Sequence, residues 1–548
     1  MTRYLIIFAL ILNIWAISSY GTDEEYAPIV HLRHGKVRGI VRSVGDKKIY
    51  LYEGFRFGDT NRFEKSTMIT SWPDDVYNAT KLGNSCVQFM NQFVLENVTY
   101  ESEDCLFLNV YKPVTKNEKL LPVMVWIYGG GFQGGSIFLS FYDSSYLASF
   151  GEVIVVAINY RLGPFGFLYG DGKNAPGNLG FHDQLLGLKW VQENIENFGG
   201  DPNKVTIFGE SAGSMSVSAL VQSPLAKGLF HRAIMQSGAG YLSYPLLRDN
   251  KQLALEKTKR LSEKLNCKNE NIKHLLACLK MKTIEEIKNA ALGDGKEMMA
   301  NELFQPIIGD DVLPYDIVQF KNDSNHVDLL YGITHDEGGM MVLMSFPELM
   351  DDKTILTMKQ VHEKISGMLI QMNMTNYSNE IIHHYTNNLD ASNIKEVRKM
   401  FVKLFTDFTL GCPTMLFGQR IAQISEKVNN FYSYRLDRRG VAAIPMGCTF
   451  EWLGVCHGAD IPYVFHNSML KNSSKDVQLS NDMIKAWTNF AKTGHPGTMG
   501  SIEWRQVYEN GQKSSASTML LDVEYKMVDD IFKETCDGIW EKIFESYK

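Results

Sequence analysis

The sequence has no block of basic residues. Its 548 residues include 55 Lys and Arg against 62 Asp and Glu, which gives a formal net charge of −7. A nucleic-acid backbone demands a dense cationic face, because every phosphate carries negative charge. We therefore expect no nucleic-acid partner.

Internal repeats, low-complexity linkers and heptad runs are also missing from the chain. With 45% apolar and 21% charged residues, the composition is that of a globular protein with material for a large core. Disorder is therefore a poor interpretation. The length would allow three or four domains at roughly 150 residues each, but the motifs below favour a single domain over residues 22–548.

Long hydrophobic runs occur only at the start of the chain. Arg3 precedes an apolar run from Leu5 to Ile17, and small and polar residues follow up to Gly21. The run is too short to span a bilayer and is typical of a signal peptide, so we predict that residues 1–21 are removed. A membrane anchor is the alternative.

The remaining sequence leads us to expect a secreted, extracellular protein without a membrane span. The last five residues, Phe544 to Lys548, form no apolar tail that could be exchanged for a lipid anchor. We expect a monomer or a homodimer.

Cysteine usage is consistent with an oxidising compartment. The eight cysteines allow 105 pairings. Proximity along the chain suggests three pairs, and the two cysteines that are left over, Cys412 and Cys536, are predicted to pair with each other. The predicted bridges are Cys86–Cys105, Cys267–Cys278, Cys448–Cys456 and Cys412–Cys536. Six Asn-x-Ser/Thr sequons predict a glycosylated surface, at Asn78, Asn97, Asn322, Asn373, Asn376 and Asn472.

The pattern of apolar runs predicts an α/β fold. Near the start, Lys36 to Val41 and Lys47 to Tyr52 indicate strands of a β-meander. A helical stripe from Leu185 to Phe198 ends at Gly199-Gly200. Continuous apolar runs alternate with such helices and favour a mostly parallel sheet covered on both faces. These runs are Pro122–Tyr128, Val153–Asn159, Val205–Phe208, Ala233–Gln236, Leu329–Thr334 and Phe431–Leu436.

A candidate nucleophile lies where one of these strands ends. Val205 to Phe208 is followed by Gly209-Glu210-Ser211-Ala212-Gly213, and Ser214 to Val221 can form a helix. A nucleophile on a strained strand-to-helix turn needs small flanking residues, which the two glycines supply. The bare pattern also arises by chance, so its strand–helix context carries the prediction.

Ester hydrolysis through Ser211 would need hydrogen-bond donors for the oxyanion. The N–H of Ala212 can supply one donor, and Gly130 and Gly131, in the glycine run after the strand Pro122–Tyr128, can supply the others. A simple loop is the alternative interpretation of three consecutive glycines.

A serine nucleophile also needs a base and an acid, which in this type of fold follow in the order acid, then histidine. Among the late histidines, His457 lies in a loop beside Cys456 and Gly458, whereas His383 and His384 lie in a polar helical segment. For the acid, Glu337 follows the strand Leu329–Thr334, and Asp336 competes with it. Spacing alone does not separate the two carboxyls.

Seven stretches of the chain resemble the type B carboxylesterases, the cholinesterase-like branch of the α/β hydrolases. They are Glu103–Tyr111, Tyr128–Phe132, Asn159–Arg161, Ala175–Asn178, Phe208–Gly213, Asp336–Gly338 and Cys456–Gly458. The resemblance covers nearly all of residues 22–548 and implies the α/β-hydrolase fold. It implies Ser211, Glu337 and His457 as the catalytic triad, with an oxyanion hole from Gly130, Gly131 and Ala212, and no metal or cofactor. It also implies three of the four bridges, all except Cys448–Cys456.

The substrate prediction comes from departures from that family. The cholinesterases of that family share a Trp between their first two cysteines. This Trp holds a quaternary ammonium group by cation–π attraction. Here that segment offers Phe89, Phe93 and Tyr100 but no Trp. After the acid comes a methionine-rich segment, Gly339–Met344, which provides a softer apolar wall or ordinary core packing. We expect a serine carboxylesterase for apolar esters rather than a true acetylcholinesterase.

Two other classes of function remain open. The chain could be a catalytically silent, cholinesterase-like binding protein, because a fold does not fix function. It could also be a scavenger that reacts with esters rapidly and turns over slowly.

Overall fold

The computed structural model describes residues 25–90, 100–116, 119–240, 250–292, 303–314, 325–372, 374–425, 429–508 and 515–546. The predicted signal peptide, Phe93 and the sequons at Asn97, Asn322 and Asn373 lie outside these ranges. The sequons at Asn78, Asn376 and Asn472 lie within them, and all three asparagines are exposed.

An 11-stranded mixed sheet forms the centre of the protein, in the order β22-β21-β18-β17-β16-β15-β11-β12-β10-β4-β3. Its strands are β3 Ile40–Val44, β4 Lys47–Arg56, β10 Phe107–Pro113, β11 Leu121–Ile127, β12 Ile154–Ile158, β15 Gly200–Glu210, β16 Arg232–Gln236, β17 Asp328–Thr334, β18 Phe431–Leu436, β21 Ser517–Leu521 and β22 Lys526–Asp529. A separate three-stranded sheet contains β1 Val30–Leu32, β2 Gly35–Arg38 and β7 Val76–Asn78.

The middle of the large sheet is parallel and its edges are antiparallel. Parallel pairing runs from β12 through β11, β15, β16, β17 and β18 to β21. All five residues of β12 are buried, as expected of a strand covered on both faces. The α/β class and all six predicted apolar strands are therefore confirmed, with ends shifted by a few residues.

Two sequence predictions were wrong in detail. The predicted strand Lys36–Val41 is divided between β2 and β3, which belong to different sheets. The division falls at Gly39, where a Cβ would overlap the carbonyl oxygen of Leu51 on β4. The predicted helix at Leu185 begins earlier, at Leu179, because Asn178 adopts the left-handed conformation and ends the preceding extended segment.

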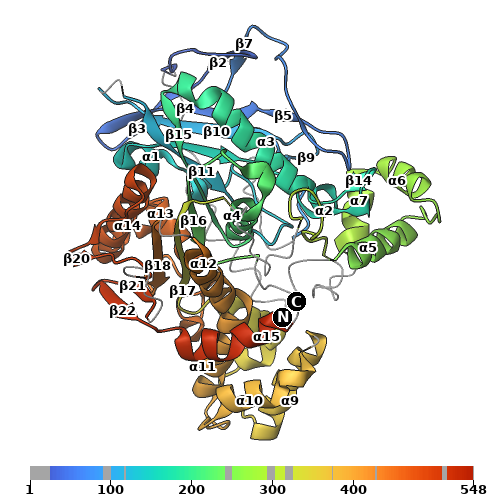
Figure 1. Cartoon of the computed structure of the whole chain (residues 1–548), viewed down its shortest axis with the longest axis vertical. Coiled ribbons are helices and arrows are strands. Elements are labelled where there is room, and N and C mark those ends of the chain that lie inside the picture. Colours follow the sequence, from blue (N-terminus) through green and yellow to red (C-terminus); the bar gives the residue numbers. More distant parts are fainter. Residues whose placement is uncertain are drawn as a thin grey trace.

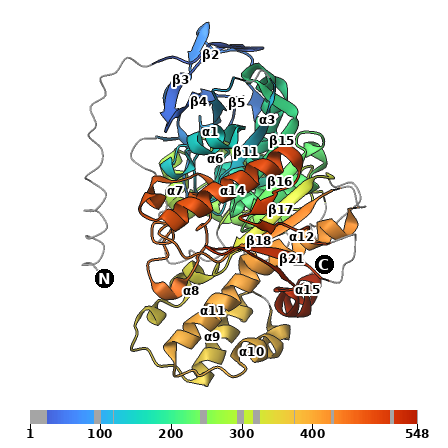
Figure 2. The same ribbon diagram turned by 90° about the vertical axis from the view of Figure 1, so that its left-hand side faces the viewer.

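Helices cover both faces of the sheet (Figure 1), with α1 and α14 on one side and α3, α4 and α12 on the other. Helices α9, α10 and α11 gather at one end of the molecule (Figure 2). The helices are α1 Ser145–Gly151, α2 Gly163–Phe167, α3 Leu179–Asn194, α4 Ala212–Gln222, α5 Lys251–Lys264, α6 Ile272–Lys280, α7 Ile284–Leu292, α8 Gly339–Ser345, α9 Met358–Gln371, α10 Ser378–Thr386, α11 Ile394–Phe405, α12 Cys412–Ile424, α13 Ile461–Val464, α14 Ser474–Thr493 and α15 Glu541–Glu545.

One helical stretch in the described ranges is long and apolar enough to cross a membrane, which the sequence analysis had not anticipated. It runs over Ile394–Ile424 and includes a π-helical segment, Thr406–Gly411. Its most apolar window is 94% buried inside the protein. Part of the cover comes from the C-terminal residues, because Trp540 packs against Phe408 with ring centroids 5.3 Å apart.

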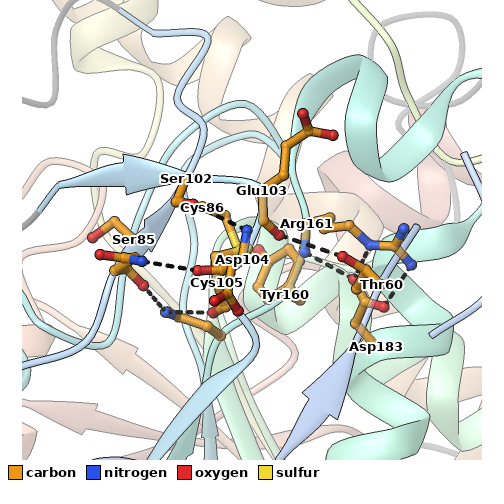
Figure 3. Close-up of a disulfide and its surroundings, with 12 residues drawn as sticks. Thr60, Ser85, Cys86, Ser102, Glu103, Asp104, Cys105, Tyr160, Arg161 and Asp183 are labelled. Atoms are coloured by element: carbon orange, nitrogen blue, oxygen red, sulfur yellow. Dashed lines mark hydrogen bonds and ion pairs between the residues drawn. A yellow bond between two sulfur atoms is a disulfide. The ribbon is translucent and has the colours of Figure 1, made fainter. Parts of the chain in front are cut away.

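All eight cysteines are paired, in the four bridges that the sequence predicted. Cys412–Cys536 closes the longest loop and ties α12 to the C-terminal segment. Close to Cys86–Cys105, the buried side chains of Arg161 and Asp183 form a bidentate ion pair (Figure 3), with N···O distances of 2.7 and 2.8 Å. The Cys86–Cys105 bridge itself anchors the segment that carries Phe89 covalently.

Candidate active site

Ser211 lies on a tight turn between β15 and α4. Strand β15 ends at Glu210 and helix α4 begins at Ala212, which leaves Ser211 alone at the turn. Its backbone angles, φ 58° and ψ −125°, are ones that non-glycine residues rarely adopt. The Ser211 N–H donates to the carbonyl of Gln236 at 2.9 Å, which ties the turn to neighbouring β16.

The two flanking glycines are required by close backbone contacts. A Cβ at Gly209 would overlap the backbone of Gly213, and a Cβ at Gly213 would overlap the carbonyl of Ile127 on β11. This is the close approach of strand and helix that the sequence pattern predicted.

Glu337 and His457 are joined by a short hydrogen bond. Oε2 of Glu337 lies 2.6 Å from Nδ1 of His457, and Oε1 accepts the N–H of Thr334 at the end of β17. The Glu337 side chain is fully buried, whereas His457 is 24% exposed. Glu337 is therefore held from both carboxylate oxygens and fixes the orientation of the imidazole ring.

The other ring nitrogen of His457 faces a residue that the sequence analysis did not assign to the site. Nε2 lies 3.2 Å from Oε1 of Glu210, which is nearly buried. In the described part of the chain, no hydrogen bond joins the Ser211 hydroxyl to His457. Catalytic hydrogen bonds are often long in the absence of substrate and tighten when it binds. The position of Glu210, directly before the nucleophile, was the signal that could have identified it.

The carboxyls around His457 change its acid–base properties. Burial alone would lower the pKa of His457, but the charges of Glu210 and Glu337 raise it above its usual range. Burial also raises the pKa of Glu210, although His457 acts in the opposite direction. The two carboxylates therefore favour the charged form of His457.

The glycine run lies against Ser211. A Cβ at Gly129 would overlap Cβ of Ser211, and Gly130 and Gly131 both have positive φ. Within the described ranges, the N–H groups of Gly130, Gly131 and Ala212 donate to no protein acceptor. Unpaired backbone donors beside a serine side chain suit an oxyanion, which would supply the missing acceptor.

One apolar side chain lies against the glycine run. Met90, which the sequence analysis did not single out, places its sulfur 3.9 Å from the Cβ position of Gly131. Phe89 is buried and packs against Phe165, whereas Tyr100 is 84% exposed. On α8, Met344 is half exposed, so at least one methionine after Glu337 is not core.

One group of potential metal ligands lies elsewhere in the described residues. His182, Asp310 and Asp311 place ligand atoms within 4.8 Å of one another. Lys65 already forms an ion pair with Asp311, and Asp310 accepts the N–H groups of two residues that follow it. These carboxylates are therefore already engaged, and no assignment of a metal follows.

Comparison with known proteins gives one consistent result. The sequence profile of the carboxylesterase family matches residues 26–540. The chain is 33% identical over 514 residues to "Cholinesterase" of Mus musculus, covering 90% of this chain and 83% of that protein. It is 34% identical over 491 residues to "Bile salt-activated lipase" of Bos taurus, covering 86% and 79%. Against "Acetylcholinesterase-1" of Trittame loki it is 32% identical over 531 residues, covering 92% and 93%.

Proposed function

This chain belongs to the carboxylesterase family and has the α/β-hydrolase fold, and we propose that it is a secreted serine carboxylesterase that hydrolyses apolar esters through Ser211. The observation that carries the proposal is the buried Glu337–His457 hydrogen bond, formed beside a serine on a strained strand-to-helix turn. A silent relative would have no need to keep this constellation.

The proposed mechanism is acyl transfer in two stages. His457 takes the proton of Ser211 as the hydroxyl attacks the ester carbonyl, and the N–H groups of Gly130, Gly131 and Ala212 hold the oxyanion. His457 then protonates the departing alcohol. Water repeats these steps on the acyl-enzyme and releases the acid. Glu337 orients the ring of His457 and stabilises its charged form.

The position of Met90 beside Gly131 supports esters of apolar acids or alcohols as substrates. Met90 and Phe89 lie in the segment where cholinesterases share a Trp. Met90 has no aromatic ring and Phe89 is buried against Phe165, so neither offers an open aromatic face to a quaternary ammonium group. Glu210 is a nearby carboxyl that could attract a cation, but His457 already faces it. We therefore expect higher kcat/KM for uncharged esters than for choline esters.

Secretion is supported by the four disulfides, since such bridges persist in oxidising compartments. Exposed sequons at Asn78, Asn376 and Asn472 are compatible with glycosylation on this route. Deglycosylation of the secreted protein followed by mass spectrometry would locate the sugars.

Ser211→Ala tests the proposal directly. We expect this variant to lose hydrolysis of p-nitrophenyl butyrate and to lose labelling by a fluorescent organophosphonate. Ser237→Ala is a matched control, because Ser237 also has positive φ at the end of a parallel strand, and its buried hydroxyl has no hydrogen-bond partner among the described residues. Turnover by Ser211→Ala equal to that of Ser237→Ala would contradict the assignment.

The same reagents separate the rival functions. Absence of an organophosphonate adduct on the native protein would indicate a silent binding protein. Rapid acylation followed by deacylation over hours would indicate a scavenger. A series of esters with increasing acyl length, measured beside butyrylthiocholine, would test the substrate class, and faster turnover of the choline ester would refute it.

A further inference from the structure

Asp336 and Glu337 are neighbours whose carboxylates serve different partners. Glu337 turns inward to His457, whereas the Asp336 side chain, 25% exposed, turns toward the backbone that precedes His457. A residue that looked like a competitor for the role of catalytic acid is thus bound to the same loop at another point.

Two backbone hydrogen bonds join Asp336 to Val455. The N–H of Asp336 donates to the carbonyl of Val455, and the N–H of Val455 donates to Oδ2 of Asp336, both at 2.9 Å. Val455 lies two residues before His457. The turn that carries Glu337 and the loop that carries His457 are therefore connected by a closed ring of hydrogen bonds.

The residues on either side of Val455 show how closely this contact is made. Gly454 has φ +62°, and a Cβ there would overlap the Asp336 carboxylate. On the other side, Cys456 is bonded to Cys448. The three residues before His457 are held by close contact, hydrogen bonding and a covalent bond, in that order along the chain.

Packing alone does not hold this segment. Asp336 and Gly454 line a cavity of about 560 Å³, together with His335, Lys399 and Trp452. His335 lies at the cavity wall, with Nδ1 3.0 Å from Oδ1 of Asp336. Because there is open volume on this side, the hydrogen bonds of Asp336 to Val455 restrain the loop where no side chain packs against it.

We propose that Asp336 is a positioning residue for His457. By fixing the backbone of Val455 relative to the Glu337 turn, it keeps Nδ1 of His457 within hydrogen-bonding distance of Glu337. This inference rests on the proposed esterase function. A displacement of about 1 Å at a catalytic group can reduce the rate by about 100-fold, so Asp336 acts on kcat although it touches no reacting atom.

The test compares two substitutions that differ in one hydrogen bond. Asp336→Asn keeps a side-chain oxygen that can accept the N–H of Val455, whereas Asp336→Ala does not. Both lose the charge next to His335. For p-nitrophenyl butyrate we expect kcat of Asp336→Ala to fall by about 10- to 100-fold with KM changed less than about twofold. Asp336→Asn should keep kcat within about threefold of wild type.

Asp437→Ala is the matched control, because Asp437 also follows a parallel strand, but its carboxylate pairs with Arg435 and not with the loop that carries His457. It should leave kcat unchanged. Circular dichroism and thermal melting establish folding, and Asp336→Leu, which fills the space without an acceptor, replaces the Ala variant if that variant does not fold.

Unchanged kcat in Asp336→Ala would overturn the proposal, and so would equal losses in the Asn and Ala variants. Failure of the esterase assignment is distinguished separately, because Ser211→Ala would then remain active.

Discussion

Removing the charge of Glu210 should lower the pKa of the base that activates Ser211. Glu210→Gln replaces a carboxylate by an uncharged group of the same shape, 3.2 Å from Nε2 of His457. Two unit charges at this distance interact by about 5 kcal/mol at an effective dielectric constant of about 20, which is an upper limit of almost 4 pKa units. Partial protonation of the buried Glu210 reduces this limit, so we expect a shift of about 1–3 units.

The sign follows from which protonation state is active. The imidazole must be neutral to accept the Ser211 proton, and carboxylates raise the pKa of His457 by favouring its charged form. Without the Glu210 charge, His457 loses its proton at lower pH. The acid limb of kcat/KM should therefore move to lower pH by about 1–3 units, while the plateau at high pH falls because the imidazolium loses one stabilising charge.

The assay is the pH dependence of kcat/KM for an uncharged ester, which reports ionisations of the free enzyme. Glu210→Asp is the control, since it keeps the charge but shortens the side chain, and its acid limb should stay near that of wild type. An acid limb in Glu210→Gln that is unchanged, or that moves to higher pH, would refute the electrostatic argument.

Two further predictions concern stability. Replacing both cysteines of Cys412–Cys536 by Ser should lower the free energy of unfolding by about 5 kcal/mol, against about 2.5 kcal/mol for Cys448–Cys456, from loop lengths set by separations of 124 and 8 residues. Loss of Cys448–Cys456 should lower kcat more than loss of Cys412–Cys536, because Cys456 adjoins His457. Urea unfolding and kcat, measured on both variants, would test whether stability and activity respond in opposite order. Arg161→Ala should cost about 3–5 kcal/mol in the same unfolding assay, because it leaves the buried Asp183 carboxylate without its charged partner and with only the backbone N–H of residue 161. A loss below about 1 kcal/mol would show that the pair is dispensable.

Local patterns predicted the parts of the site that lie close together in sequence. The turn at Ser211 was identifiable because Gly209 and Gly213 have a steric function that depends only on nearby backbone. The parallel strands were identifiable because burial on both faces requires continuous apolar runs. Their ends did not follow from the apolar pattern, as at Gly39, where the close contact with Leu51 on the neighbouring strand β4 coincides with the division of the chain between two sheets.

Relations between distant segments could not be predicted in this way. Spacing left Asp336 and Glu337 equivalent, because both follow β17 and the choice depends on which side chain meets the loop containing His457. The contact of Glu210 with Nε2 of His457 likewise depends on how that loop folds over the end of β15. The burial of the apolar helix Ile394–Ile424 could not be predicted from its composition for a similar reason, because residues from other parts of the chain, such as Trp540, pack against it.

The apolar helix Ile394–Ile424 is synthesised well before the residues that cover it. Cys412 of this helix bridges to Cys536, which follows Cys412 by 124 positions. Arg420 of the same helix pairs with Glu541, which is synthesised later still. At about 5–20 residues per second, a ribosome needs roughly 6–25 seconds for this span. For that time the nascent chain displays the part of this apolar surface, around Phe408, that Trp540 will cover. A premature stop shortly before Cys536 would make this exposure permanent, so even a short C-terminal truncation should give a product retained by chaperones rather than a slightly weakened enzyme.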